Sequence, residues 1–452
     1  MPRPVDPEFL PRHSYALLAV VAREPAKPIR DIDIDDRRHR RLQLPPATLV
    51  EDVLGRSTDE YRAGQYRPPI SLRDAVNALL RGELPMTADR LLAPTDDPGA
   101  TDTISRAFLA DRRRGVLGVF VQTKGDVEQV YASRLSLDAL SEGFSTPVAL
   151  TSGVAHNQPS VAELPDGSLF VVYQSESGTS ADIRAKRGTF AQLATAPEIG
   201  VAVTPEIAEE APFVVAAGSV VTVFFHKTIE RGDDPTTNRW YFRRWSLNDT
   251  VWEEVDTEPR ELAPTDTTDQ RFHAAVDSNR KIWAVISAAG HLWAIRLDPS
   301  TAALQPPKQV DEPPTGNVNA RPFVLCPRSG GGAWVFWHNG GLRARPFRDG
   351  AWGDVETLTE TDAEDQLPFA VEDADGALWV IWTRGKSPHS ELFARRRDAL
   401  GQWGARRKVV TSPGDDHNPF AVAGADTAIW LFWDSDRNGR FHVYVKRIVT
   451  AL

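Results

Sequence analysis

Residues 366–385 read QLPFAVEDADGALWVIWTRG. The front half has the pattern of a strand, DADG (373–376) has the composition of a tight turn, and LWVIW (378–382) follows as a second strand. Trp379 and Trp382 stand three positions apart, so on a strand they point to opposite faces. A run that is apolar on both faces predicts a strand covered on both sides rather than a half-exposed one.

This stretch recurs along the chain, giving seven copies spaced 46 to 61 residues apart. Their anchor residues at the start of the first strand are Ala107, Pro159, Pro212, His273, Pro322, Pro368 and Pro419. Each copy continues with a turn and a third strand that ends in arginine. These arginines are Arg134, Arg187, Arg244, Arg296, Arg345, Arg396 and Arg447. A short fourth segment follows most copies, as in AWGDVETLT (351–359). Four strands at this period predict an all-β, seven-bladed β-propeller with four-stranded blades over residues 84–452.

Closure of the ring is predicted from the two ends of the repeat region. The last copy stops after its third strand, at FHVYVKRIVTAL (441–452), so a fourth strand is missing there. The stretch from Met86 onward resembles a fourth segment, which predicts that Arg90 to Ala93 form the outer strand of the seventh blade. Pairing the two ends in one blade removes the open sheet edges.

The composition excludes several classes of protein. A single core of ordinary size does not accommodate 452 residues, whereas stacked repeats do. The net charge of −10 implies no broad basic surface for nucleic acid. The lone Cys326 allows no internal disulfide, which favours a reducing compartment. No apolar run is long enough for a membrane span, and SYALLAVVA (14–22) is a poor signal peptide. We therefore expect a cytoplasmic protein, or one delivered outside as part of a particle.

Residues 1–83 do not repeat and are expected to form a small, partly helical extension. Its clearest element is a helix over residues 71–81, capped by Ser71, ended by Gly82 and carrying one apolar stripe. The aspartates of RDIDIDDRRHRR (30–41) are interpreted as a solvated, self-pairing charged segment rather than as metal ligands. We expect this extension either to dock on another protein or to plug the propeller.

A ring of polar residues, here called the collar, is predicted on one face of the propeller. Segments that enter the first strand of each blade and leave the second strand open on this face. The collar residues before the anchors are Ser105, Arg106, His156, Asn157, Gln158, Glu210, Gln270, Arg271, Arg321, Asp365, Gln366, His417 and Asn418. Those at the ends of the second strands are Gln122, Gln174, His226, His338, Arg384 and Asp434. Such a polar ring on an apolar scaffold suits ligand binding, although these groups equally suit the capping of strand ends.

Two further expectations concern the faces of the ring. The longest insertion after a second strand, KTIERGDDPTTNR (227–239), is long enough to form a lip over the collar. The arginines that end the third strands are expected on the opposite face, paired with acidic turn residues such as Asp166, Asp375 and Asp426.

The repeats over residues 86–452 resemble those of sialidase-like and seven-bladed lectin propellers, through their strand pattern and DG-x-x-W turns. Sialidase resemblance implies three arginines for a substrate carboxylate, a tyrosine nucleophile paired with a glutamate, and an aspartate acid/base. Arg106, Arg271 and Arg321 would supply the cationic cluster, while Tyr173 is better interpreted as a core residue. DADGALW lacks the serine and threonine of the sialidase Asp-box.

Separately, SLRDAVNALLRGELP (71–85) resembles a leader on modules of bacterial phage-tail-like contractile injection particles. Together these features predict a non-catalytic recognition propeller that binds a glycan or a protein and is tethered by its N-terminal segment to a larger assembly. The alternative is a sialidase-like glycoside hydrolase, which needs two carboxylates at a defined separation. Glu210, Asp365 and Asp434 are available for that role. No cofactor or metal is expected.

Overall fold

The computed structural model describes most of the chain beyond residue 88 and two short strands before it. Described are residues 20–21, 34–35, 89–92, 101–124, 127–138, 143–177, 180–231, 234–248, 251–262, 271–311, 322–348, 350–360, 364–398, 401–410, 414–425, 428–437 and 439–449. The helix expected over residues 71–81 lies outside this part of the chain. The strands β1 (Val20–Val21) and β2 (Ile34–Asp35) pair with each other in antiparallel fashion.

Seven antiparallel sheets follow one another along the chain, each one a blade. Blade I contains β4 (Thr101–Asp111), β5 (Gly115–Lys124), β6 (Val127–Ser136) and β7 (Val148–Ala149). Blade II contains β8 (His156–Glu163), β9 (Leu169–Ser177), β10 (Ser180–Gly188) and β11 (Glu198–Ala202), with the short 3-10 helix η4 (Leu193–Thr195) before β11. Blade III contains β12 (Ala208–Ala217), β13 (Val220–Arg231), β14 (Asp234–Asn248), β15 (Val251–Glu254) and β16 (Arg260–Glu261).

The remaining four blades keep the same order. Blade IV contains β17 (Phe272–Val276), β18 (Ile282–Ala288), β19 (His291–Leu297) and β20 (Lys308–Gln309). Blade V contains β21 (Phe323–Pro327), β22 (Ala333–His338), β23 (Leu342–Arg348), β24 (Ala351–Trp352) and β25 (Glu356–Thr357). Blade VI contains β26 (Asp365–Glu372), β27 (Leu378–Arg384), β28 (Glu391–Arg397) and β29 (Arg407–Lys408). Blade VII contains β30 (Asp416–Ala423), β31 (Ala428–Ser435), β32 (His442–Val449) and β3 (Arg90–Leu91).

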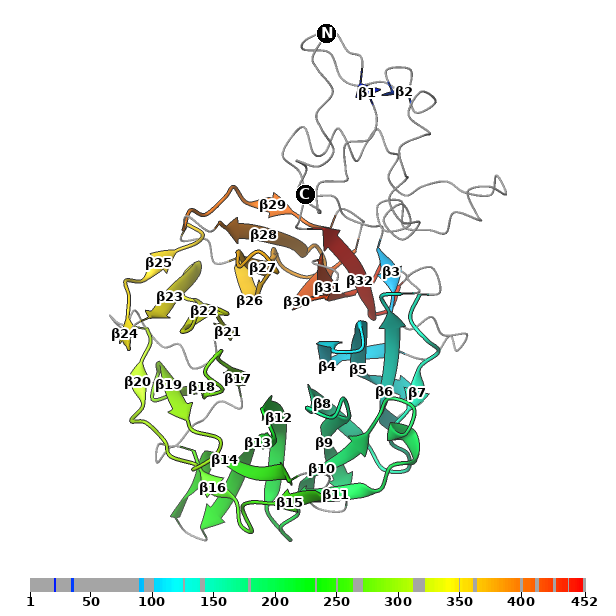
Figure 1. The fold of residues 1–452 in the computed structure, drawn as a ribbon, viewed down its shortest axis with the longest axis vertical. Coiled ribbons are helices and arrows are strands. Elements are labelled where there is room, and N and C mark those ends of the chain that lie inside the picture. The colour runs from blue at the N-terminus through cyan, green and yellow to red at the C-terminus, as the bar shows by residue number, and fades with distance from the viewer. Residues whose placement is uncertain are drawn as a thin grey trace.

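The blades stand in a closed ring around a central axis (Figure 1). The first strand of each blade lies nearest the axis and the fourth lies at the rim. The predicted seven-bladed propeller is therefore confirmed. In blades III and V the outermost position is shared by two short strands that pair with the same third strand.

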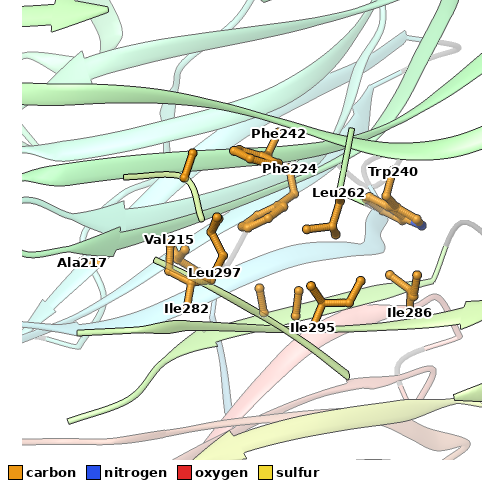
Figure 2. Packing of buried hydrophobic residues seen from close by; sticks show 13 residues of the cluster. Val215, Ala217, Phe224, Trp240, Phe242, Leu262, Ile282, Ile286, Ile295 and Leu297 are labelled. Atoms are coloured by element: carbon orange, nitrogen blue, oxygen red, sulfur yellow. The ribbon is translucent and has the colours of Figure 1, made fainter. Parts of the chain in front are cut away.

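Hydrophobic clusters fill the junctions between blades, as the apolar second strands require. Blade III contributes Phe224, Trp240 and Phe242 to one cluster, and blade IV contributes Ile282 and Ile295, so the two sheets bury each other's faces (Figure 2). A comparable cluster lies at each of the other junctions in the described part of the ring. Each fully buried large side chain contributes about 1.5–3 kcal/mol to stability, so the core of this molecule is distributed around the ring.

The paired tryptophans behave as their spacing predicts. Trp379 packs in the cluster between blades VI and VII, whereas Trp382 packs in the cluster between blades V and VI. Trp430 and Trp433 divide in the same way between the two faces of blade VII. Two tryptophans three positions apart therefore pack one blade against both of its neighbours.

The ring closes through the strand that was expected to complete blade VII. Arg90 pairs with Val445, and Leu91 pairs with Tyr444, so β3 becomes the fourth strand beside β32. Asp89, just before β3, lies 2.6 Å from Arg437 Nη1 and 2.6 Å from Lys446 Nζ. Leu92 is fully buried between blades VII and I. A two-residue strand is thus held by ion pairs and apolar packing in addition to its ladder.

The arginines that end the third strands are largely paired with acids, as expected. Five pairs are formed: Arg134–Asp111, Arg187–Asp166, Arg244–Asp256, Arg296–Asp277 and Arg396–Asp373. Asp375 is not the partner in its blade, because Asp373 takes that role, and Asp426 lies outside the described residues. Arg345 also departs from the expectation: Pro346 pairs with Trp334 where the other blades carry the paired arginine, so Arg345 stands one position earlier.

The position of Arg345 belongs to a second repeated device that links neighbouring blades. Its Nη1 donates to the carbonyl of Val310 in blade IV at 2.9 Å. The equivalent Arg243 donates to Val201 of blade II, Arg395 to Leu358 of blade V, and Lys446 to Val409 of blade VI. Each cation therefore satisfies a main-chain carbonyl at the outer strand of the preceding blade.

Candidate functional site

The collar residues lie where the first and second strands of each blade meet at one end of the sheet. Asp365 is opposite Arg384, Glu210 is opposite His226, and His417 is opposite Asp434 in the strand register. Asn157 and Gln174 are opposed in blade II in the same way. The antiparallel pairing thus brings predicted residues together in pairs, blade by blade.

The register shifts at the collar end of the first strand in five blades, and in four of these the shift lies beside a proline anchor. The residues at these four bulges have positive φ, namely Gln158 (48°), Ala211 (53°), Leu367 (52°) and Asn418 (51°). Each of them precedes a proline anchor, and a residue before proline normally adopts an extended conformation. The first strand is an edge strand facing the axis, so the missing N–H of proline breaks no ladder there. Such bulges redirect side chains near binding sites.

In blade VI the collar acid is fully engaged. Asp365 is completely buried and accepts a hydrogen bond from Trp382 Nε1 at 2.8 Å. Arg384 Nη1 lies 3.4 Å from its carboxylate, and a quarter of the Arg384 side chain is exposed. This pair joins the ends of β26 and β27 while part of the Arg384 side chain stays exposed.

Blade VII repeats this arrangement with a different cation. Trp433 Nε1 donates to Asp416 at 2.9 Å, and Arg437 Nη2 lies 3.0 Å from the same oxygen. Burial raises the pKa of the Asp416 carboxyl, and the hydrogen bonds from Ser435, Arg437 and Trp433 oppose that rise. Arg437 also reaches Asp89, so one guanidinium connects the collar end of blade VII to the closing strand.

Three predicted collar residues of blade VII come together around one carboxylate. Asn418 Nδ2 donates to Asp434 Oδ2 at 3.0 Å, and His417 Nε2 lies 4.0 Å from that oxygen. The His417 ring meets the ring of Phe441 edge-on, with centroids 4.9 Å apart. Phe441 is 37% exposed, although a phenylalanine buries its ring in most sites. This exposed aromatic beside a polar cluster was not predicted from the sequence.

The collar residues of blade II tie this blade to its neighbours. Asn157 Nδ2 donates to Glu128 of blade I at 3.2 Å and to Glu176 at 3.1 Å. Gln174 is buried and accepts the main-chain N–H of Ala211 in blade III at 3.3 Å. Both side chains therefore act as links between blades.

His156 is also part of the structure of blade II rather than of an open surface. It is 3% exposed, and its ring meets that of Tyr173 at 5.4 Å. Burial lowers the pKa of His156, so the imidazole is neutral at neutral pH.

In blade III the expected lip is a continuation of the sheet. Strands β13 and β14 remain paired beyond the collar, from Lys227 opposite Arg239 to Arg231 opposite Asp234. The insertion therefore forms a two-stranded extension rather than an irregular loop, because its residues keep antiparallel register. At its base, Lys227 Nζ lies 3.0 Å from the fully buried Glu209. His226 is buried and packs against Trp240, with ring centroids 5.5 Å apart.

Of the three arginines predicted to form a cationic cluster, the structure describes the side chain of Arg271 alone. Arg271 is exposed just before β17. Arg106 lies on β4 opposite Phe120, but its side chain falls outside the described part, as does the whole of Arg321. Their convergence stays a prediction.

The collar residue of blade V, His338, lies at the end of β22. Its main-chain N–H donates to the carbonyl of Pro322 at 3.3 Å. This hydrogen bond closes the collar end of blade V, as the buried carboxylates do in blades VI and VII.

Aromatic rings of the first strands form a floor beneath the collar, here called the aromatic floor. It consists of Phe213, His273, Phe369 and Phe420. Consecutive ring centroids are 5.3 Å apart for Phe213–His273, 6.3 Å for His273–Phe369 and 4.3 Å for Phe369–Phe420. The three phenylalanines and His273 are all partly exposed. Sequence reasoning missed this floor, although a Pro-Phe pair recurs at the anchors in blades III, V, VI and VII.

Tyr173 and Glu198 form a tyrosine–glutamate pair, the kind of pair that a sialidase uses, but this pair lies away from the collar. The Tyr173 hydroxyl donates to Glu198 at 2.8 Å, but Tyr173 is fully buried between blades I and II. Glu198 belongs to β11, the outermost strand of blade II. Burial, followed by the hydrogen bond to Glu198, raises the pKa of the phenol far above its usual range. Tyr173 is therefore a core residue, as its sequence position indicated.

The described residues bear on metal binding and on membrane insertion. No group of three or more histidine, cysteine, aspartate or glutamate side chains there is arranged to hold a metal ion. Within the same part of the chain, no helix is long and apolar enough to cross a membrane.

Comparison with known proteins finds similar solved structures of low sequence identity. No protein-family model and no curated protein matches the chain. Among solved structures, an ulvan lyase described as a new family of polysaccharide lyase is similar, with a TM-score of 0.52 and 8% identity, covering 78% of this chain and 94% of the lyase. The intramolecular trans-sialidase of Ruminococcus gnavus gives a TM-score of 0.43 and 9% identity, covering 77% of this chain and 94% of that enzyme. The fungal Aleuria aurantia lectin, a six-bladed propeller, gives a TM-score of 0.38 and 10% identity, covering 71% of this chain and 100% of the lectin. At these identities the likeness concerns the propeller fold alone.

Proposed function

We propose that this protein is a non-catalytic recognition propeller that binds a glycan on its collar face. The observation that carries the proposal is the combination of a polar collar with the partly exposed aromatic floor beneath it. Binding sites for small ligands are largely apolar and hold a few placed polar groups. A sugar ring presents both a C–H face and hydroxyl groups, so it matches such a surface.

The carboxylates of the collar favour binding over hydrolysis. A glycosidase needs one carboxyl as acid and another as base or nucleophile, both facing the substrate. Asp365 is buried and bonded to Trp382 and Arg384, and Asp434 is bonded to Asn418. These acids support strand ends and side chains of the collar, which is a structural use of their charge.

The proposal is tested with the purified full-length chain on a glycan array, in parallel with a fluorogenic sialoside assay. Saturable glycan binding without turnover supports a recognition role. Turnover that is abolished by Arg271→Ala would instead establish the hydrolase alternative. Retention of no glycan, together with capture of a defined protein ligand, would show that the collar recognises protein.

We further propose that residues 1–83 tether the propeller to a larger assembly, of the contractile injection kind that the helix sequence resembles. The closing strand β3 begins at Arg90, seven residues after this segment ends, so a partner bound to the segment is close along the chain to blade VII. The test compares the full chain with a chain that starts at residue 84 in co-sedimentation with candidate particles. Equal sedimentation of both chains would contradict the tether.

A further inference from the structure

His273 occupies a position that no other histidine of the described chain shares. It comes from β17 of blade IV, and its ring contacts Phe213 of blade III and Phe369 of blade VI. Blades IV and VI are not neighbours, because blade V stands between them in the ring. A contact between their first strands therefore has to pass in front of β21, on the axis side. His273 thus lies in the middle of the ring rather than between two sheets.

One nitrogen of the His273 ring is buried among these aromatic rings. Its Nδ1 is buried and has no hydrogen-bond partner among the described residues. Burial lowers the pKa of His273 to about 4, so the ring is uncharged at neutral pH. An unpaired buried polar atom costs about 1–3 kcal/mol. Native proteins rarely keep such an atom unless water or a ligand satisfies it.

We propose that His273, Phe213, Phe369 and Phe420 form the central subsite of the collar and take a neutral pyranose ring. One face of the sugar packs on the phenylalanine rings, and one sugar hydroxyl hydrogen-bonds to His273. This inference rests on the proposed glycan binding and specifies its ligand class. An uncharged imidazole among aromatic rings offers a hydrogen bond but no charge to compensate a carboxylate, and burying an uncompensated carboxylate is costly.

The same chemistry argues for binding rather than catalysis at this position. A group with a pKa of about 4 is a weak base at neutral pH, far from the value that suits general base catalysis. An anionic sugar would find its cation at the exposed Arg271 or at Arg384 on the collar, outside the aromatic floor. Neutral and anionic sugars therefore depend on different residues.

The test uses the full-length chain and an array of neutral and anionic oligosaccharides. The neutral probes carry galactosyl, glucosyl, mannosyl or fucosyl ends, and the anionic probes carry sialyl or glucuronyl ends. We expect retention of a neutral probe and a loss of affinity of about tenfold or more in His273→Phe, which keeps the ring but removes both nitrogens. His273→Gln retains a hydrogen-bonding group and should lose less. His389→Gln, at an exposed histidine of the loop between β27 and β28, is the matched control and should bind as the wild type does.

A second measurement keeps the inference testable if a variant folds poorly. In the wild-type chain, the nitrogen chemical shifts of His273 should change when the retained neutral oligosaccharide is added. Equal affinity of wild type and His273→Phe for that probe, or retention of anionic probes alone, would overturn the central subsite. Retention of no probe by the wild type would overturn glycan binding itself, and this inference with it.

Discussion

At the scale of single residues, buried carboxylates stabilise this fold by accepting several hydrogen bonds each. Asp373 accepts the indole N–H of Trp379 at 2.8 Å and the main-chain N–H groups of Asp375 and Ala377. Arg396 lies 3.4 Å away. Asp277 collects a similar set of partners in blade IV, from Trp283, Asn279, Lys281 and Arg296. One acid thereby fixes a turn, an indole and an arginine.

Asp373→Asn is expected to lower the free energy of unfolding by about 2–3 kcal/mol, because the amide cannot replace a buried carboxylate with several donors around it. Denaturant midpoints of the two chains measure this loss. The matched control is Asp375→Asn, two positions along the same turn, where the side chain is exposed. Equal losses at both positions would show that Asp373 has no special role.

His273 should also give the fold a dependence on acid. Its pKa in the folded chain is about 4, below the ordinary value of 6.5, so the folded state binds the proton less readily than the unfolded state does. The stability that it contributes is complete above about pH 6.5 and declines as the pH falls toward 4. In His273→Phe this decline is absent, so the difference in stability between variant and wild type should change by about 1–3 kcal/mol over that interval, in favour of the variant. Denaturant midpoints across this range of pH measure it, and parallel profiles would contradict the assignment.

At the scale of elements, the hydrogen bonds between the third strand of one blade and the outer strand of the previous one can be tested directly. Arg395 Nε donates to Gly404 at 2.8 Å within blade VI, and its Nη1 donates to Leu358 of blade V. Arg395→Ala leaves both carbonyls without this donor and should cost about 1–3 kcal/mol. The neighbouring exposed Arg406→Ala should change stability by less than about 0.5 kcal/mol. Chemical denaturation compares the two, and equal losses would contradict the link between blades.

Much of the element structure follows from the sequence because its signals are local and repeated. The opposite-facing tryptophans and the period of the copies suffice to predict seven blades. The likeness of the stretch from Met86 to a fourth segment predicts a closing strand from Arg90 to Ala93, and the structure pairs Arg90 and Leu91 there. The sequence did not predict which side chains pair with each other across a blade. The pairing of Trp382 with Asp365 joins residues 17 positions apart, and Asp373 rather than Asp375 receives Arg396. Strands β13 and β14 stay paired beyond Lys227, but the composition of this stretch is also that of a loop, so the sequence does not distinguish the two.

The candidate site was predictable only in part for the same reason. Strand ends place His417, Asn418 and Asp434 on one blade, and the structure brings them around one carboxylate. The aromatic floor depends on contacts between blades III, IV, VI and VII, whose residues lie up to about two hundred positions apart along the chain. No pattern within a single copy encodes those contacts.

At the scale of the whole molecule, stability depends on the junction where the two ends of the ring meet. Asp89 is bound by Arg437 and Lys446, and Leu92 is buried between blades VII and I. Deleting residues 86–94 should lower the thermal midpoint of the entire propeller, since it opens a sheet edge and exposes both neighbouring faces. Asp89→Ala should produce a smaller decrease of the same kind. Asp138→Ala, at an exposed ion pair with Arg114, serves as the control. Unchanged melting of the deletion chain would mean that the ring holds without its closing strand.

The order of strands in blade VII also has a consequence for synthesis. The closing strand β3 is made about 350 residues before its partner β32 (His442–Val449). At about 5–20 residues per second, the wait between the two is on the order of tens of seconds. During that interval Leu91 and Leu92 have no native partner, so the nascent chain carries an unmatched apolar segment until translation of the final blade allows the circle to form.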